Sequence, residues 1–228
     1  MNRWKAFAIH LLLSLVLIST ISAAALLTWY PYGLYRISGL DRLLLVMLCI
    51  DVVAGPLLTL LIYKPGKPGL RFDLKVIAGV QAAFLAYGLN TLWKARPVFL
   101  VAADVRFTLI AASEVDPTQL SRAARPEWRS LPWSGPILVG VLPPETPQER
   151  EALLTAFISE GRDQEQLPDQ YRPYDEVVPL LLRNATPLDG RKAPLVPGKV
   201  GLPIYSRDDA AWMVVDPGTG QPQRVVSR

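Results

Sequence analysis

One carboxylate, Asp51, lies within the otherwise apolar stretch 43–63, and it is the first residue to consider for chemistry. An ionised carboxylate in an apolar medium is costly, so it needs either a partner or a proton. Two interpretations stay open: a polar docking point for a helix of another protein, or an internal hydrogen bond to Thr59, Gln81 or Asn90. A proton relay is disfavoured, because no other ionisable group lies at that depth.

The other reactive residue types do not form a catalytic or metal site. His10 and Cys49 are the only histidine and the only cysteine, and they lie in different apolar stretches. A zinc site needs three or four nitrogen or sulfur ligands, and the usual nucleophilic sites need a histidine near the nucleophile. A single cysteine also excludes an internal disulfide framework. The acidic pairs 175–176 and 208–209 are typical of solvated surfaces. We therefore expect a non-enzymatic protein without cofactor or metal, whose function is recognition.

Three long apolar segments must position these residues. They cover residues 6–27, 43–63 and 76–93. A helix needs about 20 mostly apolar residues to cross roughly 30 Å of hydrocarbon. The sequence thus predicts a membrane protein with three transmembrane α-helices in a region spanning residues 1–93, followed by a small α+β extracytoplasmic domain at 94–228.

The distribution of charge along the chain indicates the orientation in the membrane and excludes one class of function. Residues 1–93 hold eight basic and three acidic residues, whereas residues 94–228 hold 16 and 17. The excess positive charge flanks the spans and does not form a basic folded surface, so nucleic-acid binding is excluded. Basic residues are more frequent before the first span and in the second loop, 64–75, than in the first loop. This pattern places the N-terminus in the cytoplasm and the C-terminal domain in the periplasm of a diderm bacterium.

The first span has an alternative interpretation. Arg3, Lys5, the apolar run and the small residues 23–25 resemble a cleavable signal peptide. The apolar run is longer than a signal core and continues to Leu27, and Trp29, Tyr30 and Tyr32 follow at the positions of an interfacial aromatic belt. A retained span is therefore favoured. Under either interpretation the C-terminal domain lies outside the cytoplasm.

The C-terminal domain alternates short strands and helices. Thr146-Pro147-Gln148-Glu149 is a capping box that predicts the start of an amphipathic helix. Its apolar face holds Leu153, Leu154, Phe157 and Ile158. Strands are predicted over 97–103, 105–112, 136–142, 202–205, 211–215 and 223–226, and further helices over 116–124 and 174–182. Residues 161–173 are expected to be irregular, and 216–220 to form a turn.

The second span contains the step Gly55-Pro56. Proline removes a backbone donor and bends a helix. Neighbouring protein usually satisfies the carbonyl that is left free. We therefore expect this span to be shaped for contact with other helices.

Eight short stretches form an ordered set over about residues 3–110. They are 3–7 (RWKAF), 29–31 (WYP), 51–59 (DVVAGPLLT), 63–67 (YKPGK), 72–74 (FDL), 87–89 (YGL), 95–98 (ARPV) and 104–107 (DVRF). This set resembles the type IV pilin accessory proteins, the TfpX/TfpZ family. The C-terminal half offers no motif of comparable strength.

The resemblance implies an inner-membrane accessory protein that binds the major type IV pilin and supports its stability or assembly. The implied partners are the transmembrane helix of the pilin and its head domain, within the lipid bilayer and on its periplasmic side. On this hypothesis Asp51, Gly55, Pro56 and Thr59 shape a groove for the pilin helix. Two alternatives remain: a structural or binding subunit of another cell-envelope complex, and a membrane-anchored enzyme acting on lipid or peptidoglycan.

Overall fold

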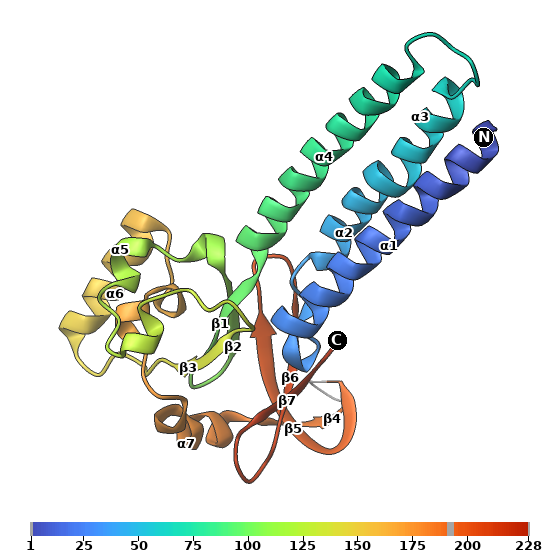
Figure 1. Cartoon of the computed structure of the whole chain (residues 1–228). Helices are drawn as coiled ribbons and strands as arrows, with labels where there is room; N and C mark the ends of the chain where they lie inside the picture. Colours follow the sequence, from blue (N-terminus) through green and yellow to red (C-terminus); the bar gives the residue numbers. More distant parts are fainter. Residues whose placement is uncertain (1, 191–193, 228) are drawn as a thin grey trace. The chain divides into compact units, whose positions relative to one another are not determined.

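A computed structural model of the chain describes residues 2–190 and 194–227 (Figure 1). The chain divides into two compact units. The helical unit comprises Met1–Leu27 and Leu40–Trp93, and the mixed unit comprises Thr28–Gly39 and Lys94–Arg228. The mixed unit therefore includes the segment 28–39, which the pattern of apolar runs groups with the transmembrane region.

Three long helices build the helical unit, and the middle one passes through a π-helical turn. Their bounds are α1 (Arg3–Trp29), α2 (Leu40–Leu48), the π-helical turn (Cys49–Ala54), α3 (Gly55–Ile62) and α4 (Leu70–Ala95). Each of the three is long and apolar enough to cross a membrane. The predicted helices over 6–27, 43–63 and 76–93 are thus confirmed as helices.

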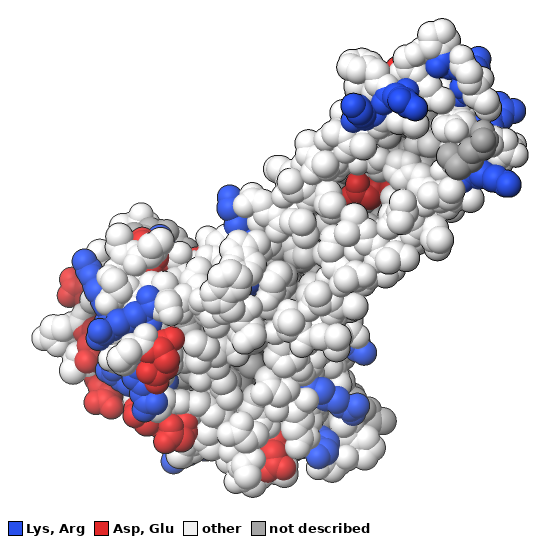
Figure 2. Space-filling view, viewed as in Figure 1, with Lys and Arg blue, Asp and Glu red and all other residues white. Residues whose placement is uncertain are grey.

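The apolar side chains of this unit point both inward and outward. Ile18 of α1 and Met47 of α2 pack together in a buried cluster to which Leu85 of α4 adds. Many others face outward, and Leu27 and Leu61 are 87% and 73% exposed. Soluble monomers rarely expose such continuous apolar surface, so these helices match a lipid environment. Figure 2 shows basic side chains gathered at the end of this unit where the turn 63–69 lies.

The π-helical turn follows from the proline. The Gly55 N–H donates to the Ile50 carbonyl, five residues back. In this register the Asp51 carbonyl would accept from residue 56, but Pro56 has no N–H. Instead Gln81 of α4 donates through Nε2 to the Asp51 carbonyl at 3.4 Å. A neighbouring helix thus satisfies the carbonyl that the proline leaves free, as expected.

A mixed β-sheet forms the centre of the other unit. Its described strands run in the order β3-β1-β2-β5-β6-β7, with β4 paired to β5. Their bounds are β1 (Pro97–Ala102), β2 (Phe107–Ala111), β3 (Ile137–Gly140), β4 (Thr186–Asp189), β5 (Leu195–Tyr205), β6 (Ala210–Val215) and β7 (Pro222–Val226). β1 pairs parallel to β3 and β2 parallel to β5, and the other neighbours are antiparallel.

The sequence of strand β1 explains why this strand lies inside the sheet. Its six residues form an unbroken apolar run, and all six are buried. Such a run needs cover on both faces, which an internal strand provides. One face of it packs in the main core, where the ring centroids of Phe99 and Tyr171 lie 5.0 Å apart and Trp128 lies 6.4 Å from the same tyrosine ring.

Three short helices complete the mixed unit: α5 (Pro117–Leu120), α6 (Pro147–Glu160) and α7 (Tyr174–Asn184). In Figure 1, α5 and α6 lie on the β3 side of the unit. The predicted capping box of α6 is confirmed, because Thr146 Oγ1 accepts from the Glu149 N–H and Glu149 accepts from the Thr146 N–H. The predicted helix over 116–124 is shorter than expected, and β4 and the first half of β5 were not predicted.

The segment 28–39 is folded into the mixed unit. It forms a short 3₁₀ helix, η1 (Pro31–Arg36), that lies against β7. Tyr30, Leu34 and Ile37 are 4%, 0% and 2% exposed. The Ser206 hydroxyl donates to the Ile37 carbonyl. This segment is therefore part of the core, although nothing in its local sequence required it.

Candidate docking site in the helical unit

The four residues predicted to dock a partner helix lie along one buried face of the middle helix. Asp51 is 5% exposed and Thr59 is 4% exposed, and Gly55 and Pro56 are also buried. Intervals of four residues place Asp51, Gly55 and Thr59 on the same side of a helix. The structure therefore brings the set together, and it packs much of this face against α1 and α4 of the same chain.

Gly55 allows α4 to approach closely. A Cβ atom at position 55 would lie only 1.8 Å from Nε2 of Gln81. The absence of a side chain thus leaves room for the amide that bonds the Asp51 carbonyl. In the sequence, Gln81 is a candidate hydrogen-bond partner for the Asp51 side chain. In the structure, its amide donates to the main-chain carbonyl of Asp51 instead.

Thr59 contacts α1. Its Oγ1 lies 2.7 Å from Nδ1 of His10, a hydrogen bond across 49 residues of sequence. Apart from the polarity of the two side chains, no sequence signal indicates this pair. The Thr59 hydroxyl is therefore already engaged by His10.

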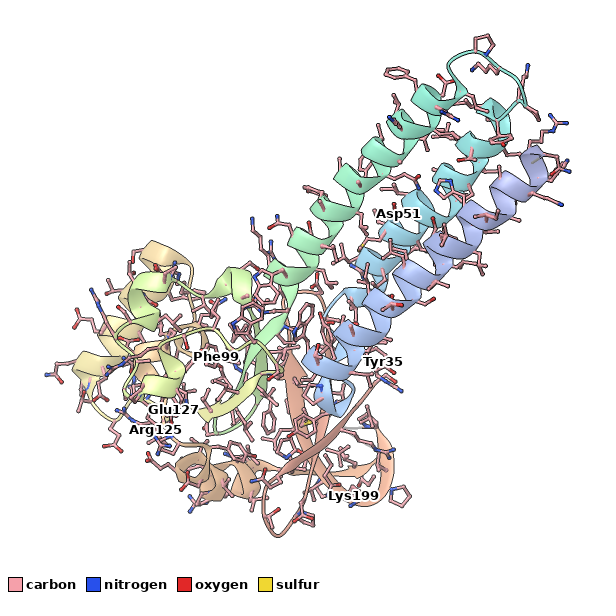
Figure 3. All side chains as sticks on the ribbon, viewed as in Figure 1. Tyr35, Asp51, Phe99, Arg125, Glu127 and Lys199 are labelled. Atoms are coloured by element: carbon pink, nitrogen blue, oxygen red, sulfur yellow. The ribbon has the colours of Figure 1, made fainter. Side chains whose placement is uncertain are left out.

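The Asp51 carboxylate keeps unused hydrogen-bonding capacity. Among residues 2–190 and 194–227, no side chain or backbone N–H forms a hydrogen bond or salt bridge with its oxygens. Asp51 is 5% exposed, and it is the only acidic residue between Asp41 and Asp73 in the sequence. Figure 3 marks its position on the middle helix. A small part of this carboxylate is therefore accessible to a donor from outside the unit.

A second candidate surface lies on the mixed unit, along α6. Leu154, Phe157 and Ile158 are 55%, 54% and 81% exposed. The sequence predicts that these side chains form the apolar face of the helix, and in the structure they are exposed. An amphipathic helix normally buries its apolar stripe, so an exposed stripe marks a candidate binding surface.

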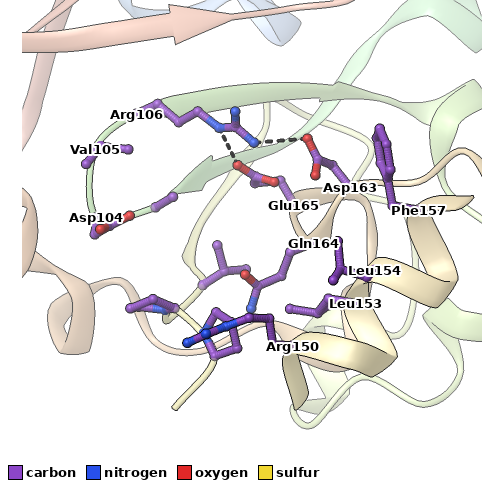
Figure 4. A pocket seen from close by; sticks show the side chains of 14 residues that line it. Asp104, Val105, Arg106, Arg150, Leu153, Leu154, Phe157, Asp163, Gln164 and Glu165 are labelled. Atoms are coloured by element: carbon purple, nitrogen blue, oxygen red, sulfur yellow. Dashed lines mark hydrogen bonds and ion pairs between the residues drawn. The ribbon is translucent and has the colours of Figure 1, made fainter. Parts of the chain in front are cut away.

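Beside α6 lies a groove of about 530 Å³ (Figure 4). Leu153, Leu154 and Phe157 line one wall. The other wall carries Arg106, whose Nε lies 2.6 Å from Glu165 Oε1 and whose Nη2 lies 3.0 Å from Asp163 Oδ2. The hydrogen bond to Glu165 raises the pKa of Arg106 above its usual value. In this wall, Arg106 thus bridges two carboxylates in one ion-pair cluster.

Within the described ranges, no three His, Cys, Asp or Glu side chains form a group able to hold a metal ion. The single histidine lies on α1, away from the acidic residues of the mixed unit in sequence.

Comparison with known proteins identifies the relatives of this chain. It is 30% identical over 187 residues to the fimbrial assembly protein of serogroup I from Dichelobacter nodosus, in an alignment that covers 81% of this chain and 72% of the relative. The chain belongs to this family of fimbrial assembly proteins. The serogroup E1 protein of the same organism is 29% identical with the same coverage, and the protein of serogroups C1 and C2 is 33% identical over 99 residues, or 42% of this chain and 76% of that relative.

No protein-family model matches the chain, and no solved structure matches it either. The relationship to the fimbrial assembly proteins therefore rests on sequence. The alignment with the serogroup I protein covers 187 residues, which is more than the helical unit or the mixed unit contains. The relationship is therefore not confined to the apolar helices.

Proposed function

We propose that this protein is a non-enzymatic inner-membrane accessory protein of type IV pilus assembly, of the TfpX/TfpZ kind, that binds the major pilin. The observation that carries this proposal is the similarity to proteins named for fimbrial assembly over four fifths of the chain. The type IV assignment comes from the motifs between residues 3 and 110. The three membrane-length helices supply the anchor that such a role needs.

The proposed topology is N-terminus in the cytoplasm and mixed unit in the periplasm. The excess of basic residues before α1 and between α3 and α4 supports it. A second argument comes from the fold. Because the segment 28–39 and residues 94–228 form one compact unit, the loop after α1 and the domain after α4 must share one side of the membrane. Three crossings satisfy that requirement, because two of them lie between the loop after α1 and the domain after α4.

Asp51 is the proposed contact for the pilin helix. A donor on that helix, approaching through the lipid, would find in the Asp51 carboxylate an acceptor that the described residues leave unbonded. Hydrogen bonds between transmembrane helices contribute about 1 kcal/mol each. Such a contact would therefore select a partner without holding it irreversibly, as an accessory protein that releases its pilin requires. The groove beside α6 is a candidate surface for the pilin head.

Co-purification tests the proposal. Asp51→Ala should reduce the amount of pilin recovered with the full-length protein from detergent-solubilised inner membranes. Asp41→Ala is the matched control, since Asp41 is an exposed carboxylate of the same helix, and it should leave recovery unchanged. Equal pilin recovery with Asp51→Ala and Asp41→Ala, at normal expression, would refute the docking role of Asp51.

Crosslinking identifies the partner directly. A photoreactive residue at position 53 is suitable, because Val53 is 47% exposed whereas Val52 and Gly55 are buried. Adducts with a pilin N-terminal helix would support the proposal. Adducts with a different envelope protein would favour the alternative, a subunit of another cell-envelope complex.

A further inference from the structure

A loop far along the sequence lies against the end of α1. Trp29, the last residue of that helix, donates through Nε1 to the Trp133 carbonyl at 2.8 Å, across 104 residues of sequence. Two residues later, a Cβ atom on Gly135 would lie 3.4 Å from the Thr28 carbonyl. All these residues belong to the mixed unit. The position of the loop 133–135 at the end of α1 is thus fixed by contacts within one compact unit.

Among the described residues, the exposed large apolar side chains of the mixed unit fall into two chemically different groups. The group along the α6 groove contains aliphatic side chains and a phenylalanine: Val105, Leu154, Phe157 and Ile158. The other group, which we name the aromatic anchor, contains only residues with a polar atom on the ring. Its members are Tyr32, Tyr35, Trp133 and Tyr205, which are 38%, 39%, 79% and 39% exposed.

Every member of the aromatic anchor lies in or next to the segment 28–39. Tyr32 and Tyr35 belong to it (Figure 3 labels Tyr35), and Trp133 accepts a hydrogen bond from it. Tyr205 directly precedes Ser206, whose hydroxyl donates to the Ile37 carbonyl. Each of the four residues therefore lies in the segment 28–39 or at a point where the chain hydrogen-bonds to that segment.

We propose that the aromatic anchor binds the head-group region of the lipid bilayer, on the side where α1 ends. This inference rests on the membrane insertion of α1 in the proposed function. Tryptophan and tyrosine are enriched at membrane–water interfaces because an apolar ring and a polar atom suit that boundary. The mixed unit then contacts the membrane through its own side chains, in addition to its connections to the helices.

Position and charge favour lipid over a protein partner as the occupant. The apolar run of α1 ends at Leu27, which is 87% exposed, so the bilayer boundary falls one or two residues before Trp29. The Arg36 guanidinium lies 5.7 Å from the Tyr35 ring and offers positive charge to lipid phosphates. A lipid surface is therefore present at the end of α1 wherever that helix is inserted.

Depth measurement by spin labelling tests the inference. The full-length protein, with Cys49→Ala to remove its one thiol, is reconstituted in vesicles of phosphatidylethanolamine and phosphatidylglycerol. A nitroxide is placed singly at Ser134, beside an intact Trp133, at Leu27 as the membrane reference and at Val105 as the aqueous reference. The readout is the ratio of oxygen accessibility to nickel-chelate accessibility. We expect the ratio at position 134 to lie between those at 27 and 105.

Two variants test whether the Trp133 ring determines the membrane depth measured at position 134. Trp133→Ala, which keeps the backbone carbonyl that Trp29 bonds, should shift the ratio at position 134 towards the value at 105. Trp133→Tyr should keep it. A ratio at 134 equal to that at 105, with a membrane value at 27, overturns the aromatic anchor alone. Low accessibility to both reagents at 134 also overturns it, because that result indicates burial by protein. An aqueous value at 27 refutes the membrane insertion of α1 itself.

Discussion

The contact between Gly55 and Gln81 allows a quantitative test of how the candidate site is built. A methyl group at position 55 would sit 1.8 Å from Gln81 Nε2, so Gly55→Ala must push the amide away. The amide then loses its hydrogen bond to the Asp51 carbonyl, which Pro56 has left without a backbone donor. Removing one partner of a buried hydrogen bond costs about 1–3 kcal/mol, and bonds between membrane helices average about 0.6 kcal/mol with a maximum of about 1.7. We expect a loss of about 1 kcal/mol.

A double-mutant cycle isolates this term. Gly55→Ala also changes helix propensity and adds a methyl group before a proline, and these effects are not easily separated in one variant. They are present equally when Gln81 is already replaced by alanine, so they cancel in the cycle. Gln81→Ala alone should lower the free energy of unfolding by about 1 kcal/mol. Adding Gly55→Ala to Gln81→Ala should then cause no further hydrogen-bond loss, giving a coupling of about 1 kcal/mol.

The assay is equilibrium unfolding of the full-length protein in mixed micelles with increasing SDS. Gly79→Ala is the matched control, because a Cβ atom there would meet no atom within 4 Å, and its effect should be the same with and without the Gln81→Ala change. Coupling between the Gly55 and Gln81 changes below about 0.5 kcal/mol would mean that the two sites act independently. That result would refute the argument that Gly55 makes room for the amide.

Three further changes probe the remaining contacts. Thr59→Val should lower the free energy of unfolding by about 1 kcal/mol in the same SDS titration, because His10 loses its partner at 2.7 Å, whereas Thr59→Ser should not. Burial raises the pKa of Tyr30 to about 12, whereas a tyrosine in the unfolded chain has a pKa of about 10. The free energy of unfolding is therefore unaffected below pH 10 and should fall by up to about 3 kcal/mol between pH 10 and 12. Unfolding measured across this range should show a smaller fall for Tyr30→Phe, and an identical profile would contradict the assignment. Gly140→Ala would place a Cβ 2.3 Å from Val177 Cγ2 and should cost about 1–3 kcal/mol in thermal unfolding, with partial recovery on adding Val177→Ala.

The local pattern of the sequence determined the elements of this protein. Continuous apolar runs of membrane length predicted the three helices, and the short apolar run 97–103 predicted a strand. The capping box at 146–149 predicted where α6 begins. These predictions succeeded because hydrophobic period, helix caps and turn residues act over a few neighbouring residues. The strand β4 and the first half of β5 escaped prediction, since proline and glycine there hide the strand pattern.

The candidate site was only partly predictable. The sequence identified Asp51, Gly55, Pro56 and Thr59 as unusual in an apolar helix, and a regular helical spacing places them on one side. It did not predict that His10 would bond Thr59, or that the Gln81 amide would bond the main chain rather than the carboxylate. Both outcomes depend on how three helices align with one another, which no local rule fixes.

Only the tertiary structure decided which faces are covered. The apolar stripe of α6 is evident in the sequence, yet the fold leaves it exposed. The segment 28–39 reads as a loop between two helices, yet residues such as Leu34 are fully buried in the mixed unit. Trp133 carries no local signal of its position, yet its carbonyl accepts a hydrogen bond from Trp29, 104 residues away. Sequence patterns specify which faces need a partner, but the partner is chosen by packing among residues far apart in the chain, where contact depends on the whole fold.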